Sequence, residues 1–325
     1  MVSARARMLR DMVRIRTVEE VLADYYRDEQ EMRTPTHFSI GQEATAVGVC
    51  SALTVQDLVY SGHRSHAPYL AKGGDLQALV AELYGKQDGC AHGRGGSMHV
   101  IDQSVGFAGS AAILGEMISV AVGSAWAFAQ AGEARVAVTF FGDGAADEGV
   151  FFESLNFAAV HRLPVVFVCE NNLYSISSPL AARHAAGTSI HGRAAACGVP
   201  SVHVDGNDVF AVHDAARRAV RQAREGGGPV LLELATYRWR AHVGPGDDHD
   251  HGYRSLEEIE TWKAGCPIVR AAQVLRDEKP DIDSAVRGWR TEFREETHRA
   301  VDRAKTLPFP DTGRLLDGAY LPVAH

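Results

Sequence analysis

The sequence has few cysteines, and none of them forms a recognisable pair. The five cysteines among 325 residues are odd in number, widely spaced and never arranged as C-x-x-C. This pattern indicates neither a disulfide framework nor a structural zinc site of the usual ligand spacing. It is typical of a reducing compartment, so we expect the protein to be cytoplasmic.

Long hydrophobic runs and an excess of positive charge are also missing. The longest stretch without a charged side chain, residues 117–132, is shorter than the roughly 20 residues that a membrane span needs. The 33 basic and 41 acidic residues give a net charge of −8, and no basic stripe stands out. We therefore expect neither membrane insertion nor nucleic-acid binding. A hydrophobic content of 46% is ample for a folded core of one large domain or two small ones.

The first 30 residues combine positive charge with helical periodicity. Five arginines between positions 5 and 16 could imitate a mitochondrial transit peptide. The apolar residues of the same segment recur at near-helical spacing, which favours an amphipathic helix that packs on the body of the protein. The rest of the first 100 residues is less regular, and we expect the Gly- and His-rich segments 61–67 and 90–99 to form loops.

From residue 135 onward, strand and helix signals alternate. A β-branched and aromatic run at 135–141 precedes a helical pattern that begins near Asp147 and ends at Pro164. Further strands are predicted at 165–169, 201–204 and 229–234, with a helix at 209–224. This order predicts an α/β fold with a mostly parallel sheet and helices on both faces. Past residue 257 the chain is charged and predicted to be helical through about residue 305.

Two of the predicted strands end in oxygen-bearing side chains. Asp143 follows the first strand, within Gly142-Asp143-Gly144, and Asn172 follows the second strand 29 residues later. Ligands gather at the carboxyl ends of parallel strands, and carboxylate and amide oxygens suit Mg²⁺. The glycines would let backbone N–H groups approach a phosphate, so the combination predicts a magnesium-diphosphate site, although each fragment alone is more typical of a simple turn.

Other phosphate-binding patterns fit less well. A dinucleotide fingerprint would need glycine where Asp147 stands, and no P-loop is present. The Gly-Asp-Gly run and the asparagine 29 residues after Asp143 resemble the thiamine-diphosphate signature. From about residue 8 to residue 260 the chain also resembles the α subunit of the decarboxylating first component of 2-oxo acid dehydrogenase complexes, of the pyruvate and acetoin dehydrogenase type. The segments that carry this resemblance are 37–44, 62–66, 93–99, 142–149, 170–174 and 237–242.

The resemblance implies a role for each matching residue. Asp143, the side chain of Asn172 and the backbone carbonyl of Tyr174 would hold magnesium. The implied cofactor-binding residues are His63, Arg64, Ala112, Leu114, Gly142, Asp143, Gly144, Ala145, Asn172, Tyr174 and His242, and Ile113 and Leu114 fall where the family's loop supports the aminopyrimidine. His37 and His242 would be catalytic, since histidine can exchange protons near neutral pH. Two alternatives remain open: Arg64 could form a surface salt bridge, and His37 could be a packed structural histidine.

The resemblance also implies an architecture and an activity. Residues 1–260 would form a thiamine-diphosphate-binding domain that includes the N-terminal helix, and residues 261–325 a helical C-terminal extension with a tail. The enzyme would decarboxylate a 2-oxo acid and pass the acyl unit to a lipoyl group or another acceptor. A β subunit would supply the glutamate that activates the cofactor, in an α2β2 heterotetramer, and a lipoyl acyltransferase is a further expected partner.

Some positions depart from the family pattern. His63 stands where relatives usually have tyrosine, and Ala112 where many have glycine. Val243 replaces a serine that can be phosphorylated in pyruvate dehydrogenases, which excludes kinase regulation at that position. The acidic and histidine-rich segment 247–251 could suggest a transition-metal site, but a mobile loop over the cofactor entrance is the preferred interpretation.

These departures keep two other functions open. A two-component transketolase-like enzyme that moves a two-carbon unit from a ketose or a 2-oxo acid would use the same cofactor. A phosphate- or nucleotide-binding protein without catalysis would need only the anion site.

Overall fold

The computed structural model describes residues 3–314, so residues 315–325 of the predicted C-terminal extension lie outside the described range. A six-stranded sheet forms the centre of the molecule, with strand order β2-β1-β3-β4-β8-β7, and every pairing in it is parallel. Its strands are β1 (Leu58–Ser61), β2 (Phe107–Ser110), β3 (Ala137–Gly142), β4 (Val165–Asn171), β7 (Ser201–Asp205) and β8 (Val230–Ala235). The predicted α/β fold with a parallel sheet is therefore confirmed. A separate pair, β5 (Tyr174–Ser175) and β6 (Ser178–Pro179), is antiparallel.

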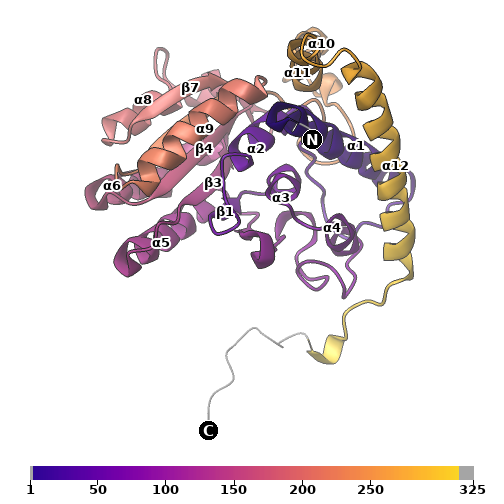
Figure 1. Cartoon of the computed structure of the whole chain (residues 1–325). Helices are drawn as coiled ribbons and strands as arrows, with labels where there is room; N and C mark the ends of the chain where they lie inside the picture. The colour runs from indigo at the N-terminus through magenta and orange to yellow at the C-terminus, as the bar shows by residue number, and fades with distance from the viewer. Residues whose placement is uncertain (1–2, 315–325) are drawn as a thin grey trace.

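Helices cover both faces of the sheet, as Figure 1 shows. On one face, α9 (Val209–Arg224) packs against the strands, and α2 (Glu43–Cys50) and α1 (Ala4–Asp28) lie outside it as part of the same core. The other face is covered by α5 (Glu116–Ala131), α6 (Gly149–His161) and α8 (Ile190–Ala196). Alternate side chains of β3 point to opposite faces, so Val138 and Phe140 join the first core and Ala137 and Phe141 the second. Both faces of the strands are apolar because both are covered.

The N-terminal helix packs against the last long helix of the chain. Helix α1 lies along α12 (Ile282–Thr306), and Arg10 and Arg14 pair with Glu292 and Glu296 at 2.8 and 3.2 Å. The predicted amphipathic helix at the N-terminus is thus confirmed. The expected helical segment after residue 257 consists of α10 (Leu256–Ala264), α11 (Pro267–Leu275) and α12. Within residues 3–314, no helix combines the length and apolar character that crossing a bilayer requires.

The first 100 residues contain more regular structure than the sequence predicted. Besides α1, α2 and β1, they form α3 (His66–Lys72) and α4 (Leu76–Leu83). Helix α3 begins inside the segment 61–67, which was expected to be a loop. The loop prediction is therefore wrong for the last two residues of this segment. Pro68 lies in the first turn of α3, where a missing N–H costs nothing, and Gly73 ends the helix with a positive φ of 104°. Every residue of α2 is buried, so it lacks the one-sided periodicity by which helices are predicted.

The segment between β3 and β4 brings the predicted site residues to one edge of the sheet. Strand β3 continues into the short 3-10 helix η3 (Asp143–Asp147), and α6 begins two residues after Asp147, where the helix was predicted to start. Strands β3 and β4 are direct neighbours, with Gly142 opposite Glu170. Asp143 and Asn172 therefore follow adjacent strand ends, as a shared ion would require.

Candidate active site

A cavity of about 210 Å³ opens at the carboxyl ends of β1, β3 and β4. All of the predicted site residues line it: His37, His63, Arg64, Ala112, Leu114, Gly142, Asp143, Gly144, Ala145, Asn172, Tyr174 and His242. These residues come from six separate segments of the chain. The sequence showed only their order along the chain, and the tertiary structure brings them together in one cavity. Their individual roles stay predictions.

Asp143 and Asn172 form the centre of one wall. The side chain of Asp143 is 1% exposed and forms an ion pair with Arg183, which also pairs with Asp147. Burial raises the pKa of Asp143, while the Arg183 guanidinium and nearby backbone amides oppose that rise. Arg183 is thus a positive group against the predicted metal ligand, and it shows that this carboxylate is compensated by a cation.

The other predicted metal ligands also offer oxygen atoms. The Asn172 side chain donates through Nδ2 to Gln42 at 3.2 Å and accepts the backbone N–H of Tyr174 at 3.3 Å. The Tyr174 hydroxyl donates to Glu258 at 2.9 Å, so its side chain is engaged elsewhere and its backbone carbonyl remains for a ligand. A carboxylate, an amide and a carbonyl are the donor set of a hard cation, so these residues fit magnesium.

The absence of a side chain has a different structural role at each of the two glycines beside Asp143. A Cβ on Gly144 would lie 2.4 Å from the Ser175 hydroxyl, so the missing side chain lets strand β5 pack closely. A Cβ on Gly142 would meet nothing of this chain within 4 Å, although Gly142 lines the cavity. Gly142 therefore leaves open space at the strand end, which is where a phosphate would approach the backbone.

Three histidines and an arginine form a second part of the cavity lining, here called the histidine wall. The rings of His37, His63 and His242 have centroids 4.7 to 5.2 Å apart, and their nearest nitrogens lie within 4.8 Å of one another. Arg64 is 7% exposed and donates to the carbonyls of Phe38 and His242, so the alternative of a surface salt bridge is wrong. The buried Nδ1 of His37 has no hydrogen-bond partner and is available to a ligand.

The electrostatics of the histidine wall favour an anion. Burial, followed by the charge of Arg64, lowers the pKa of His37 to about 3, of His63 to about 2 and of His242 to about 4. The imidazoles are therefore neutral at pH 7, and each can donate one N–H. Three nitrogens at this spacing could otherwise suggest a transition metal, but the guanidinium beside them repels a cation and attracts a diphosphate or a carboxylate.

Glu170 and Gln42 are cavity residues that sequence reasoning missed. Glu170 was assigned to the turn after β4, but the strand continues through Asn171 and buries it. Burial raises the pKa of Glu170 to about 7, although the Thr45 hydroxyl and Arg64 oppose the rise. The Nε2 of Gln42 is buried without a partner. No spacing signal in the sequence separated these residues from ordinary polar positions.

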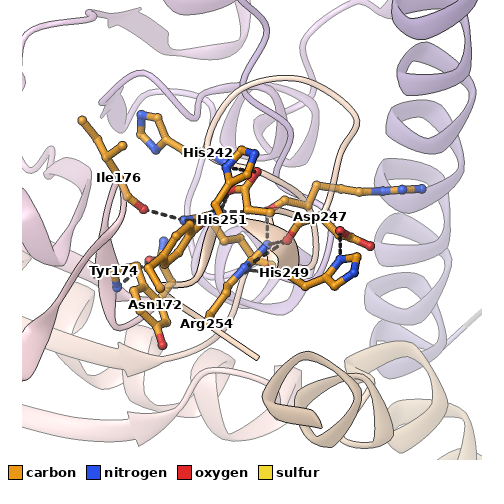
Figure 2. A network of polar contacts seen from close by, with 12 residues as sticks. Asn172, Tyr174, Ile176, His242, Asp247, His249, His251 and Arg254 are labelled. Atoms are coloured by element: carbon orange, nitrogen blue, oxygen red, sulfur yellow. Dashed lines mark hydrogen bonds and ion pairs between the residues drawn. The ribbon is translucent and has the colours of Figure 1, made fainter. Parts of the chain in front are cut away.

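The segment after β8 winds around two buried arginines (Figure 2). Arg254 donates to the carbonyls of Arg238 at 2.8 Å and Arg240 at 2.9 Å, and Arg238 donates to the carbonyl of Ile176 at 2.6 Å. The loop therefore has a polar core of its own, which ties it to the segment after β5.

One carboxylate of this loop fixes a predicted catalytic residue. Asp248 accepts hydrogen bonds from Arg238, Tyr253 and the backbone N–H of His242, the last at 3.1 Å. Asp248 was missed because it was read as one member of an acidic and histidine-rich run. The remaining members do not converge on one point: the Asp247 carboxylate pairs with His249, and in the described part of the chain the sole group of metal-ligand type is the three histidines of the cavity. The transition-metal alternative for segment 247–251 has no support.

Comparison with known proteins agrees with this geometry. The model of the family described as dehydrogenase E1 component matches residues 10–312. The chain belongs to this family. It is 37% identical over 314 residues to the pyruvate dehydrogenase E1 component subunit alpha of Porphyra purpurea, which covers 94% of this chain and 89% of that relative.

Bacterial relatives whose names refer to acetoin are similar to this chain to about the same degree. The α subunits of the acetoin:2,6-dichlorophenolindophenol oxidoreductases of Cupriavidus necator and Bacillus subtilis are 40% and 39% identical over 293 and 288 residues. Each alignment covers 88% of this chain, and 85% and 84% of the respective relative. The resemblance inferred from six short segments is confirmed: the protein is an E1 component, a subunit of a thiamine-diphosphate-dependent 2-oxo acid dehydrogenase.

The cavity of this E1 component suits the charged end of that cofactor. Unpartnered polar atoms of His37 and Gln42 lie at its lining, and Gly142 leaves open space at the strand end. The oxygen atoms around Asp143 and the guanidinium of Arg64 line the same cavity. In a diphosphate with a bound divalent cation, the cation suits the oxygen atoms around Asp143 and the anionic phosphates suit Arg64.

Proposed function

We propose that this E1 component is the α subunit of an enzyme that decarboxylates a 2-oxo acid and passes the acyl unit to a lipoyl group or another acceptor. The observation that carries the proposal is the placement of Asp143 and Asn172 at adjacent strand ends, in the same cavity as Arg64. The pyruvate and acetoin names of its relatives support this substrate range.

Each wall would hold a different part of the cofactor. Asp143, Asn172 and the carbonyl of Tyr174 would bind Mg²⁺, while Arg64 and His63 would bind diphosphate oxygens through N–H groups. Thiamine diphosphate supplies the carbanion chemistry, and the protein supplies binding, orientation and electrostatics.

The catalytic histidines would act in their neutral forms. Because the pKa values of His37 and His242 are about 3 and about 4, both rings would donate an N–H to a substrate carboxylate or oxo group at pH 7. Asp248 would keep His242 in place by accepting its backbone N–H.

The proposed assembly is an α2β2 heterotetramer in the cytoplasm. Charged residues of this chain surround the diphosphate end of the cavity, and a β subunit would contribute the glutamate that acts on the aminopyrimidine. A lipoyl acyltransferase would then receive the acyl unit.

A transketolase-like reaction is the second candidate. It is favoured by the altered loop after His242, which begins with Val243 in place of the serine of pyruvate dehydrogenases. The ketose would replace the 2-oxo acid as the donor of the transferred unit.

One experiment separates these functions. The chain would be co-purified with the β subunit encoded by a neighbouring gene, supplied with thiamine diphosphate and Mg²⁺, and offered a panel of 2-oxo acids, acetoin and ketoses. We expect release of carbon dioxide from at least one 2-oxo acid. Turnover of ketoses without carbon dioxide release from any 2-oxo acid would favour the second candidate. Cofactor affinity that is unchanged in Asp143→Ala would support a binding protein without catalysis.

A further inference from the structure

Helix α1 carries a buried carboxylate that has a specific set of partners. Glu19 lies in the second half of α1, and its side chain is 0% exposed. One carboxylate oxygen accepts the backbone N–H of Ser39, and the other lies 3.0 Å from Nδ1 of His66. Because a buried carboxylate is costly unless it is hydrogen-bonded, these two contacts account for the polar residue at this position.

The contacts of Glu19 continue through two further buried side chains to His37. Nε2 of His66 lies 3.0 Å from the hydroxyl of Ser97, which accepts the backbone N–H of His37 at 3.2 Å. His66 and Ser97 are both 0% exposed. We call Glu19, His66 and Ser97 the buried relay. It connects the N-terminal helix to a residue that lines the cavity.

One assignment of hydrogens satisfies every contact of the buried relay. The Ser97 hydroxyl accepts from His37 and donates its own hydrogen to the unprotonated Nε2 of His66. Nδ1 of His66 then carries the ring hydrogen and donates it to Glu19, whose carboxylate only accepts. All of these hydrogen bonds run in one direction, from the His37 amide to the carboxylate. Each bond in such a chain strengthens the others, so the hold on His37 depends on all three side chains.

Serine, histidine and a carboxylate also form the nucleophilic triads of hydrolases, but the buried relay is placed differently. A nucleophilic hydroxyl has to be reached by the substrate. Ser97 is 0% exposed and is not among the residues that line the cavity, and its oxygen already accepts the His37 amide. The role of the relay therefore lies in what it holds.

The relay fixes the backbone on both sides of one residue. It binds the amides of His37 and Ser39, and the carbonyl of Phe38 between them accepts a hydrogen bond from Arg64. Three consecutive residues are thus tied by their backbones to buried side chains. The Nδ1 atom of the His37 ring, by contrast, has no partner. The backbone is held while the ring stays available to a ligand.

Helix α1 holds the next part of the same segment in a similar way. Arg16 pairs with Glu43 at 2.5 and 2.7 Å, and Glu43 accepts the backbone N–H of Gly41 at 2.9 Å. Arg16 and Glu19 lie on the same face of α1, because they are three positions apart. The buried polar side chains of this helix are therefore directed at a segment that contributes two residues to the cavity lining.

We propose that Glu19, His66 and Ser97 are positioning residues, which fix the backbone of His37 so that its ring meets the substrate in the cavity. This inference rests on the proposed function, because it assigns the relay to a histidine that acts on the substrate. None of the three residues lines the cavity, so they act through His37. Loss of the relay should slow turnover and leave the predicted metal ligands in place.

The first test uses Ser97→Ala, the smallest change in the relay. In the enzyme assembled with thiamine diphosphate and Mg²⁺, we expect kcat to fall about tenfold, which is the effect of one lost hydrogen bond in a buried chain. Cofactor affinity should change less than about threefold. The same substitution is then made in a His37→Ala background. Because the relay acts through His37, the double variant should be no slower than His37→Ala alone, whereas independent effects would multiply.

A second test has a readout besides activity and a matched control. Glu19→Gln keeps the shape of the side chain but has one acceptor oxygen, so it cannot accept both N–H groups. Asp57→Asn is the control: Asp57 is 1% exposed and accepts the backbone N–H of Val136 at 3.0 Å, but it precedes β1, at the end of the sheet away from the cavity. Both variants should have lower melting temperatures.

The two variants should differ in amide exchange and in turnover. Glu19→Gln and Ser97→Ala should speed hydrogen exchange in segment 37–40 about tenfold, measured by mass spectrometry of overlapping peptides. Asp57→Asn should leave both that exchange and kcat within about twofold of wild type, since its contacts lie elsewhere. If Glu19→Gln does not fold, Ser97→Ala and its double variant decide the question.

The outcomes separate this inference from the proposed function. Wild-type turnover with multiplied losses in the double variant, or with unchanged exchange in Ser97→Ala, would overturn the relay and leave the proposed function intact. Equal losses of turnover in Glu19→Gln and Asp57→Asn would mean that lower stability explains the effect, and would also overturn it. No wild-type turnover with any donor, but faster exchange of segment 37–40 in the relay variants, would overturn the proposed function and support the hold of the relay on His37.

Discussion

The two walls of the cavity are built in different ways. The strand-end wall, formed by residues 142–145 and Asn172, comes from one strand–helix–strand unit in which consecutive elements pack together. The histidine wall, formed by His37, His63, Arg64 and His242, comes from three segments that are far apart in the sequence. A local unit can be recognised from its spacing, whereas a wall assembled from distant segments depends on the packing of the whole domain.

The walls also differ in the charge that they can hold. The strand-end wall offers oxygen atoms and an aspartate compensated by Arg183, so it suits a cation. The histidine wall offers N–H donors and a buried guanidinium, so it suits an anion. The predictions that follow test whether the walls contribute separately to cofactor binding, and they are ordered from the largest expected effect to the smallest.

The largest effect is expected at Asp143. In the assembled enzyme, Asp143→Asn should weaken thiamine diphosphate binding in the presence of Mg²⁺ by more than 100-fold, because a metal ligand loses its charge. Calorimetric titration of the cofactor measures this. Asp147→Asn is the matched control, since Asp147 also pairs with Arg183 but does not line the cavity, and it should change affinity less than fivefold. Equal losses in both variants would contradict a metal role for Asp143.

A tenfold effect is expected at Gly144. The Cβ of Gly144→Ala would collide with Ser175, so strand β5 must shift, and with it the predicted ligand Tyr174. We expect about tenfold weaker cofactor binding and a lower melting temperature. Gly149→Ala, at a glycine with open space around it, should leave both unchanged. The prediction fails if the two alanine variants behave alike.

The histidine wall should make the chain sensitive to acid. His63 has an ordinary pKa of about 6.5 when unfolded and a pKa of about 2 when folded, so the unfolded state binds more protons between these values. Stability is therefore complete above pH 6.5 and falls with pH, by up to about 1.4 kcal/mol per pH unit for this residue. Urea unfolding at pH 7.5 and 5.0 should show a smaller loss in His63→Tyr than in wild type.

A matched substitution tests the location of this effect. His203→Tyr changes an exposed histidine on β7 and should leave the acid sensitivity of wild type unaltered. An equal reduction in both variants would mean that the effect is not specific to the cavity.

The smallest effect is expected in the loop outside both walls. His249→Ala and His251→Ala remove exposed rings that lie outside the cavity lining, so cofactor affinity should stay within twofold of wild type. Zinc binding by the isolated chain should also be unchanged. A loss of zinc binding in either variant would revive the transition-metal interpretation of this loop.

The sequence by itself determined the elements whose signals are local. Helix α9 has the predicted bounds, because Asp208 caps its first turn with a side-chain oxygen and glycines follow its end. The strand-end wall was predictable for the same reason, since a β-branched run, Gly142-Asp143-Gly144 and Asn172 lie within one short segment. The family resemblance identified the residues of the histidine wall, but it did not show how they are arranged in space.

Only the tertiary structure decided which residues support the site. It buried all of α2, placed Glu170 inside the cavity with a pKa of about 7, and made Asp248 the residue that holds the backbone of His242. It also paired Arg183 with Asp143, across 40 residues of sequence. Each of these features depends on burial or on a contact between distant segments, and neither is encoded in the spacing of neighbouring residues.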